Sequence, residues 1–254
     1  MKRALILLLV AAIGACATSP LGRRQLILVD DAQMHEMGVA SFTQMKSKMP
    51  ETKDAKVNGY VQCVARNVTS VMPGGSGAWE VRVFEDKNIN AFALPGGKIG
   101  VFTGLLKAAQ TQDQLAAVIG HEVAHVIAGH SAERVSENMA SQMGMSAVQA
   151  ATGVNAEMLG MATNVFFLLP HSRAHEAEAD VLGMDYMAKA GFDPRASITL
   201  WENMSKASGG DKPPELMSTH PSDQTRIAGL TRRLPKAMPL YEEAQQQGRK
   251  PACK

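Results

Sequence analysis

The stretch GHEVAHVIAGH, residues 120 to 130, constrains this chain more than any other, because it holds three of the seven histidines. An α-helix advances about 100° per residue, so His121 and His125 lie about 40° apart on one face, one turn from each other. This is the spacing of two ligands to one zinc ion. Glu122 can reach a water at such a metal without binding the metal itself, which predicts a general base.

His130, the third histidine of this stretch, suggests the longer metzincin pattern, which continues with a glycine and a histidine at fixed offsets. Those offsets require Gly at 128 and His at 131, whereas the chain has Ala128 and Ser131. On a helix that continues past residue 130, His130 also falls about 140° from His125, away from the metal. We therefore predict that His130 is not a ligand.

The third ligand must come from elsewhere, and the segment HSRAHEAEAD, residues 171 to 180, is the best source. Glu176 and Asp180 share one helix face, while Glu178 points about 160° away from both. One carboxylate can bind the metal, and the other can accept a hydrogen bond from a ligand histidine. From the residues alone, His171 and His175 remain alternative ligands, and a solvated helix face explains the acidic run equally well.

The first residues, MKRALILLLVAAIGAC, have a positive start followed by an apolar run that ends in small residues. The run is too short for a membrane span, so residues 1–15 are predicted to be a signal peptide. Its end resembles a bacterial lipobox, which predicts that Cys16 is lipidated and that residues 16–29 form a tether. Ala17 after the cysteine favours the outer membrane. The alternative is an ordinary secretory signal that is cut near Ala17.

Removal of residues 1–15 deletes two basic residues and no acid, which leaves 24 basic (26 minus 2) and 24 acidic residues and a formal net charge of zero. A neutral chain gives no reason to expect a nucleic-acid partner. With Cys16 lipidated, Cys63 and Cys253 remain, an even number in an oxidising compartment. They form either a disulfide or two unpaired thiols.

Hydrophobic periodicity predicts an α+β fold that is mostly α-helical. Helical spacing occurs on both sides of residues 79–86 and 89–102, which are expected to form the strands of one small sheet. A chain of 254 residues with 45% hydrophobic residues can bury one sizeable core without a second domain. Residues 30–235 are therefore predicted to form a single domain, and residues 236–254 a weakly ordered C-terminal tail.

Four sequence blocks, in this order, resemble the HtpX-like zinc metallopeptidases. This family includes the CAAX prenyl-protein endopeptidases and the BepA-like and LoiP-like periplasmic lipoprotein proteases, to which the resemblance is greatest. The blocks are NAFALPGGKIGVFTGLL (90 to 106), HEVAHVIAGH, SRAHEAEAD and THPSDQTRI (219 to 227). The resemblance implies a gluzincin-type metallopeptidase domain with a small, edge-exposed β-sheet beside the zinc helix.

The resemblance also implies a role for individual residues at the metal. It implies one zinc ion per chain, with His121, His125 and Glu176 as the ligands. Glu122 would be the base, and Asp180 would accept a hydrogen bond from a ligand histidine.

Further residues follow from the same resemblance. An extended substrate would pair with the backbone of a strand formed by Asn90, Ala91, Phe92 and Ala93. His220 would lie near the zinc, either to stabilise the oxyanion by a hydrogen bond or to occupy the open zinc position until substrate displaces it. Arg226 would support the loop of His220 or the oxyanion.

These features predict a zinc-dependent endopeptidase that cleaves unfolded or misassembled envelope proteins, among them outer-membrane proteins. The expected location is the periplasmic face of the outer membrane, reached through the N-terminal lipid, near envelope assembly machinery or other lipoproteins. The alternative is a periplasmic chaperone or assembly factor with a structural zinc. Glu122 argues against this alternative, because a structural zinc site is closed and needs no base.

Overall fold

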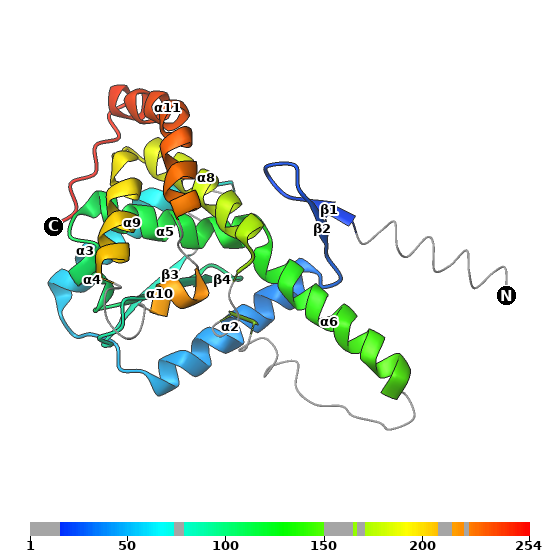
Figure 1. The fold of residues 1–254 in the computed structure, drawn as a ribbon. Helices are drawn as coiled ribbons and strands as arrows, with labels where there is room; N and C mark the ends of the chain where they lie inside the picture. Colours follow the sequence, from blue (N-terminus) through cyan, green and yellow to red (C-terminus); the bar gives the residue numbers. More distant parts are fainter. Residues whose placement is uncertain (1–15, 74–78, 150–164, 167–170, 208–214, 221–223) are drawn as a thin grey trace.

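The structure, a computed structural model, describes residues 16–73, 79–149, 165–166, 171–207, 215–220 and 224–254 (Figure 1). The predicted signal peptide lies outside the described residues. The strands are β1 Cys16–Thr18, β2 Arg24–Leu26, β3 Glu80–Phe84, β4 Ala91–Leu94 and β5 Lys98–Phe102. The helices are α2 Asp31–Lys48, α3 Ala55–Ser70, α4 Leu105–Ala108, α5 Gln112–Ile127, α6 His130–Gln149, α8 Arg173–Lys189, α9 Arg195–Ala207, α10 Glu215–Thr219 and α11 Gln224–Gln246. The predicted α+β fold, mostly α-helical, is confirmed. Within the described part of the chain, no helix has the length and apolar character needed to cross a membrane.

Helix α5, which carries the first metal-binding motif, lies at the centre of the molecule (Figure 1). Thr111 caps its N-terminus by accepting a hydrogen bond from the backbone N–H of Gln114. Every residue from Gln114 to His125 is buried. The helix is buried on all sides because it packs between the sheet and the helices α3, α8 and α9.

Helix α5 ends at Ile127, so the prediction that one helix continues past residue 130 is wrong. Gly129 has a φ of +68°, in the left-handed region that favours glycine and commonly ends helices. The chain turns at this glycine, and α6 begins at His130 in a new direction (Figure 1).

Two glycines let α5 and α8 approach each other closely at the motif. A Cβ atom on Gly120 would lie 2.8 Å from the carbonyl oxygen of Gly183, and one on Gly183 would lie 2.7 Å from the backbone nitrogen of His121. Any side chain at either position would force the helices apart. The glycine pair therefore sets the distance between the histidines of α5 and the carboxylates of α8.

The three-stranded sheet has the order β3–β5–β4, with β4 at one edge. β5 is parallel to β3 and antiparallel to β4. Side chains alternate between the two faces of β4: Phe92 and Leu94 pack with Phe42 of α2, whereas Ala91 and Ala93 join the main core. The sheet thus separates α2 from α5 (Figure 1).

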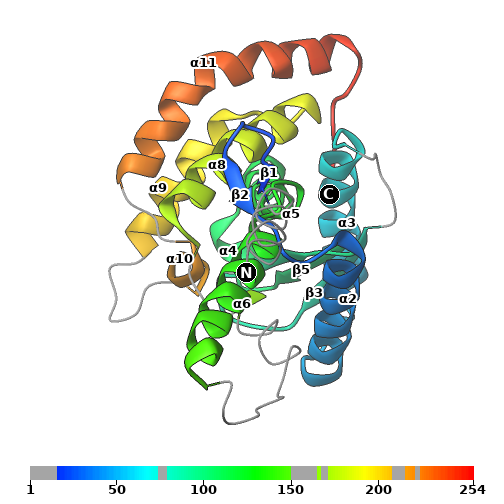
Figure 2. The ribbon, with the colours of Figure 1, turned by 90° about the vertical axis from the view of Figure 1, so that its right-hand side faces the viewer.

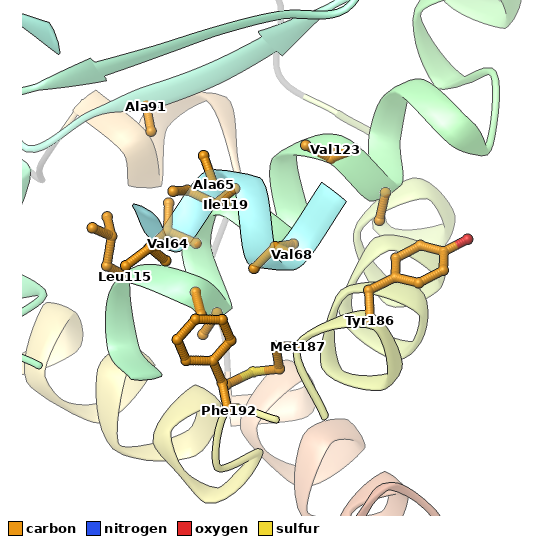
Figure 3. Close-up of a cluster of buried hydrophobic side chains, with 14 of the residues drawn as sticks. Val64, Ala65, Val68, Ala91, Leu115, Ile119, Val123, Tyr186, Met187 and Phe192 are labelled. Carbon is orange, nitrogen blue, oxygen red and sulfur yellow. The ribbon is translucent and has the colours of Figure 1, made fainter. Parts of the chain in front are cut away.

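The main core fixes α5 against α3, α8 and the segment that follows α8. Figure 3 shows Met187 and Phe192 beside aliphatic side chains of α3 and α5, namely Val64, Ala65, Val68, Leu115, Ile119 and Val123. Each large aliphatic or aromatic side chain that is fully buried contributes about 1.5–3 kcal/mol. The helix that presents the histidines is therefore rigidly held.

Residues 16–29, predicted to be a tether, are folded against the domain. β1 and β2 form an antiparallel hairpin, and Val29 is buried after it. The side chain of Gln25 donates to the carbonyl oxygen of Ala128, at the end of α5, at 2.8 Å. The hairpin consequently lies against the end of α5, near α8 (Figure 2). Its partners are about 100 positions away in the sequence, so the local pattern gives no sign of them.

The C-terminal segment 236–254, predicted to be a weakly ordered tail, continues α11 to Gln246. Pro235 and Pro239 lie inside this helix, and each removes a backbone donor. Ala237 is nevertheless fully buried against the main core, as part of the face that α11 packs on α8 and α9. Tertiary packing therefore outweighs the local preference for a helix end.

A disulfide joins Cys63 of α3 to Cys253, which decides between the two possibilities that the sequence left open. Gln112, the first residue of α5, makes two further bonds to the same terminus. Its Nε2 donates to the carbonyl oxygen of Pro251 at 2.9 Å, and its Oε1 accepts from the N–H of Cys253 at 2.9 Å. The end of the chain is thereby fastened to the start of the central helix.

Candidate metal centre and catalytic site

Four buried side chains from three parts of the chain converge, with potential ligand atoms within 4.8 Å of one another: His121, His125, Glu176 and His220. The Nε2 atoms of His121 and His125 lie 3.1 Å apart, as the four-residue spacing predicts. The carboxylate of Glu176 lies 3.3 Å from His121 Nε2 and 3.4 Å from His125 Nε2. The structure thus brings together the three predicted metal ligands, with His220 as a fourth member.

The hydrogen-bond partners of the two rings fit a metal ion. His121 directs Nδ1 at Asp180 Oδ1, 3.1 Å away, and His125 directs Nδ1 at His130 Nδ1, 2.8 Å away. When each ring donates from Nδ1, its Nε2 carries a lone pair. Two lone pairs beside a buried carboxylate repel each other unless a cation lies between them. Imidazole nitrogens and one carboxylate form a donor set that suits zinc.

The surrounding carboxylates favour positive charge at this point. Burial by itself lowers the pKa of His121, but hydrogen bonds with Asp180 and Glu176 outweigh burial and raise that pKa to about 9. Burial raises the pKa of Glu176, but the neighbouring His220 and His121 hold it well below its usual range. Charges that favour an imidazolium here also favour a divalent cation.

Glu122 is buried on α5 between the two histidines. Burial raises the pKa of its carboxyl group, which suits a group that must accept a proton. Its Oε1 accepts no hydrogen bond from any described residue, although His220 Nε2 lies 3.4 Å away. Glu122 therefore lies beside the ligand atoms, where a base is predicted.

Arg226 of α11 ties several members of the site together. It donates to Asp180 twice, from Nε at 2.8 Å and from Nη2 at 2.6 Å, and its Nη1 lies 2.7 Å from Glu176. Nη1 also donates to the backbone carbonyl of His220 at 3.3 Å, and the guanidinium lies 4.0 Å from the ring centroid of Trp201. Of the two predicted roles, these contacts fit support of the His220 segment.

His220 follows α10 and is held by a hydrogen bond from its N–H to the carbonyl oxygen of Leu216, 2.8 Å away. Its Nδ1 lies 3.0 Å from Glu176 Oε1 and 3.3 Å from His121 Nε2. The ring therefore lies among the potential ligands, with its other nitrogen toward the predicted base.

His130 and Glu178, which helical geometry predicted to point away from the metal site, both lie in its surroundings. The turn at Gly129 returns the ring of His130 to His125, so the prediction that His130 faces away is wrong, although His130 is not among the clustered ligand atoms. Glu178 does point away from Glu176, but it is buried rather than solvated, and its carboxylate lies 3.2 Å from His130 Nε2. Gly129 is the sequence signal that could have revealed this, because glycine often ends a helix.

The alternative ligands His171 and His175 are outside the cluster of ligand atoms. The ring of His171 packs on that of His125, with 3.9 Å between the centroids. His175 Nε2 lies 3.1 Å from Glu133 Oε2. Both histidines therefore support the centre from outside.

The predicted substrate strand borders the ligands. Between β4 and the metal site lies a cleft of about 30 Å³, lined among others by Asn90, Ala91, Phe92, Ala93, Glu122, His125 and His220. The N–H of Phe102 donates to the carbonyl oxygen of Asn90, so Ala91 and Ala93 direct their backbone groups away from β5. A cleft of this volume accommodates about two water molecules.

Comparisons with known proteins agree with this geometry. Residues 51–234 match the model of peptidase family M48. The Schizosaccharomyces pombe protein named mitochondrial metalloendopeptidase OMA1 is 40% identical over 179 residues, which are 70% of this chain and 53% of that protein. The human metalloendopeptidase OMA1, mitochondrial, is 32% identical over 87% of this chain and 46% of its own length. The Escherichia coli beta-barrel assembly-enhancing protease is 25% identical over 84% of this chain and 46% of its own length.

The chain spans about half the length of these curated relatives. The family match includes α5, α8 and His220, and thus every member of the ligand cluster. The resemblance to HtpX-like and CAAX-type enzymes was a looser description of the same relationship. The chain belongs to peptidase family M48.

Proposed function

We propose that this chain is a zinc-dependent endopeptidase. The observation that carries the proposal is the buried carboxyl group of Glu122 beside the converging atoms of His121, His125 and Glu176. These three ligands would hold one zinc ion per chain. The metalloendopeptidase names of several relatives support the same activity.

The residues divide the chemistry among them. A bound zinc ion supplies Lewis acidity, which polarises a carbonyl group and makes water more acidic. Glu122 takes the proton of the attacking water and returns it to the nitrogen of the leaving amine. Asp180, itself held by Arg226, keeps the Nδ1 proton on His121 and thereby keeps the Nε2 lone pair directed at the metal position.

We further propose that His220 is an inhibitory ligand in the described conformation. Its Nδ1 lies 3.0 Å from Glu176 and 3.3 Å from His121 Nε2, among the atoms that would bind zinc. The cleft beside β4 is small, about 30 Å³, and His220 is among the side chains that line it. Substrate would have to displace His220, after which its ring could donate to the oxyanion.

The substrate class follows from the strand at the edge of the sheet. Ala91 and Ala93 direct their backbone groups away from β5, where an extended peptide could pair with them. Backbone pairing selects unfolded, strand-forming segments. Unfolded or misassembled envelope proteins, in particular outer-membrane proteins, are the proposed substrates.

The proposed location is the periplasmic face of the outer membrane, with the lipid on Cys16 as the anchor. The signal-like residues 1–15 and the lipobox pattern support it, as does the name of the Escherichia coli relative, a beta-barrel assembly-enhancing protease. Other relatives carry mitochondrial names. Envelope assembly machinery and other lipoproteins are the proposed partners.

The substitution Cys16→Ser tests the anchor. It should release the protein from membranes or block its processing. A variant that is processed normally and stays at the membrane would contradict the anchor.

The substitution Glu122→Gln tests the activity, with Glu137→Gln on the exposed side of α6 as the matched control. Glu122→Gln should retain zinc and the native fold but lose cleavage of an unfolded substrate by at least about 10²-fold, because a general base contributes 10²–10⁴ in rate. Glu137→Gln should cleave normally. Full cleavage by Glu122→Gln would contradict the role of Glu122 as the base, whereas absence of cleavage by the unmodified, zinc-loaded protein would favour the rival function, a chaperone or assembly factor with structural zinc.

The substitution His220→Ala separates the two roles of that histidine. An inhibitory ligand predicts higher basal proteolysis after its removal. A loss of about 10²–10³-fold with zinc intact would instead establish the oxyanion role.

A further inference from the structure

The two histidines of α5 are oriented by different partners. His121 directs Nδ1 at a carboxylate, Asp180 Oδ1, 3.1 Å away. His125 directs Nδ1 at another imidazole, that of His130, 2.8 Å away. His130 in turn has Nε2 3.2 Å from Glu178 Oε2. The carboxylate that orients His125 is therefore one residue further away.

The proton positions in this second series follow from its two ends. His125 can bind a metal through Nε2 only as the tautomer that carries its proton on Nδ1. That proton points at His130 Nδ1, which must accept it, so the proton of His130 lies on Nε2. His130 then donates to Glu178, which accepts as an ionised carboxylate. Every donor in this series then faces an acceptor, so metal binding by His125 fixes the positions of both imidazole protons.

The N-terminal hairpin holds the far end of this series. Arg23, in the loop between β1 and β2, donates from Nε to Glu178 Oε2 at 3.1 Å. The N–H of Leu21, in the same loop, donates to Glu178 Oε1 at 3.2 Å. Both oxygens of this buried carboxylate are thus held by the hairpin while one of them accepts from His130.

Arg23 is itself fixed by a second carboxylate. Its two terminal nitrogens donate to the two oxygens of Glu133, each at 2.6 Å, in the bidentate geometry that fixes a guanidinium most firmly. Gln25 of β2 also donates to Glu133, at 3.0 Å. His175, whose Nε2 donates to the carboxylate of Glu133, stacks on His130 with 4.4 Å between the ring centroids. The hairpin, α6 and α8 therefore meet around the ring that contacts His125.

We propose that the β1–β2 hairpin is part of the metal centre: Arg23, acting through Glu178 and His130, positions His125 for metal binding. The inference rests on the proposed zinc site. It makes Arg23, Glu178 and His130 positioning residues, since none of them touches the metal position. It also means that the segment nearest the proposed membrane anchor affects how tightly the active metal is held.

The experiment measures the zinc dissociation constant of the purified full chain by competition with a chromogenic chelator. Arg23→Gln is compared with Arg24→Gln, a substitution of the neighbouring exposed arginine that makes none of these contacts. Loss of a residue that orients a ligand typically weakens metal binding by about 10–100-fold. We expect about 10-fold for Glu178→Ala, about 3-fold for the more distant Arg23→Gln, and no change for Arg24→Gln, by analogy with that range.

A second readout separates positioning from general destabilisation. Cobalt-substituted protein should show altered visible absorption bands in Glu178→Ala and Arg23→Gln, because these bands report the ligand geometry. Arg23→Lys should restore zinc affinity in part, because it returns the positive charge beside Glu178.

Three results would overturn the inference. The first is that Arg23→Gln and Glu178→Ala have the same zinc affinity and cobalt spectrum as Arg24→Gln. The hairpin would then contribute packing only and would not position His125. The second is that the metal-free variants have lower melting temperatures with unchanged zinc affinity, which would lead to the same conclusion. The third is that the unmodified protein binds no zinc, which would contradict the proposed function as well. Failure of the hairpin proposal alone is thus distinguishable from failure of the proposed zinc site.

Discussion

Two arginines from opposite ends of the chain each hold a carboxylate of α8 that serves one histidine of the metal site. Arg226 of α11 holds Asp180, which contacts His121 directly. Arg23 of the hairpin holds Glu178, which contacts His125 only through a further imidazole. The side chain of Arg226 is 6% exposed, whereas that of Arg23 is 26% exposed.

The difference in burial implies a difference in what each arginine does. A buried ion pair that loses one partner leaves an uncompensated charge and costs much stability, whereas a pair near solvent contributes little. The buried contacts of Arg226 should therefore stabilise both the metal site and the fold as a whole. Arg23, whose side chain water can partly reach, should adjust metal affinity and should affect the fold less than Arg226 does.

The largest effect on zinc binding is expected from substitution of the ligands themselves, which Arg226 and Arg23 both support through α8. His121→Ala, His125→Ala and Glu176→Ala should each abolish stoichiometric zinc binding after gel filtration, as measured by elemental analysis. His130→Ala should retain zinc, although more weakly, because its ring orients a ligand without binding the metal. Complete loss of zinc in His130→Ala would make His130 a ligand and break the comparison.

The next effect concerns stability of the metal-free protein. Arg226→Gln should lower the free energy of unfolding by about 3–5 kcal/mol, because Asp180 and Glu176 would remain buried without their partner. Arg23→Gln should lower it less than Arg226→Gln does, because the Arg23 side chain is 26% exposed and water can partly replace it beside the buried carboxylates of Glu133 and Glu178. Urea denaturation measures both values, and equal losses would contradict the proposed division of roles.

The disulfide should stabilise the packing of the C-terminal segment that follows α11, because it joins Cys253 to Cys63 of α3. The double substitution Cys63→Ser with Cys253→Ser should cost about 2–5 kcal/mol of stability. Zinc affinity of the folded variant should stay near that of the unmodified protein, since neither cysteine contacts the metal site. Chemical denaturation with and without reducing agent, together with zinc titration, checks both statements.

A direct comparison of the two carboxylates comes next. Asp180→Asn should weaken zinc binding by about 10–100-fold, because Asp180 contacts a ligand histidine directly. Glu178→Gln should weaken it less, because one further ring intervenes and the amide oxygen can still accept from His130. Chelator competition at constant pH gives the ranking, and the reverse order would refute it.

The smallest effect concerns the acid stability of the hairpin contacts. Burial raises the pKa of Glu133, but hydrogen bonds from Arg23 and Gln25 outweigh it and lower the pKa from 4.5 to about 2. A carboxyl group with a lowered folded-state pKa stabilises the protein above its unfolded pKa and loses this contribution as the pH falls. The contribution should therefore disappear between about pH 4.5 and pH 2.

The variant Glu133→Gln isolates this contribution in metal-free protein. Near pH 7 it should be slightly less stable than the unmodified chain, and the difference should vanish at low pH. A difference that stays constant with pH would show that the charge of Glu133 does not stabilise the hairpin.

The sequence alone predicted the part of the site that a single regular helix controls. His121, Glu122 and His125 lie within five residues of one helix, so their relative directions follow from helical geometry. The choice of Glu176 as third ligand came from a family resemblance. In the structure it depends on the close crossing of α5 and α8 at Gly120 and Gly183.

Only the tertiary structure decided how the two histidines are supported. The same helical rule placed His130 on the wrong side, because Gly129 ends the helix and the rule holds only within one. The hairpin and the end of α11 were predicted to be loose, because their partners lie far away in the sequence and leave no periodic pattern. A helix fixes directions locally, whereas ion pairs such as Arg23 with Glu178, 155 positions apart, exist only once the chain has folded.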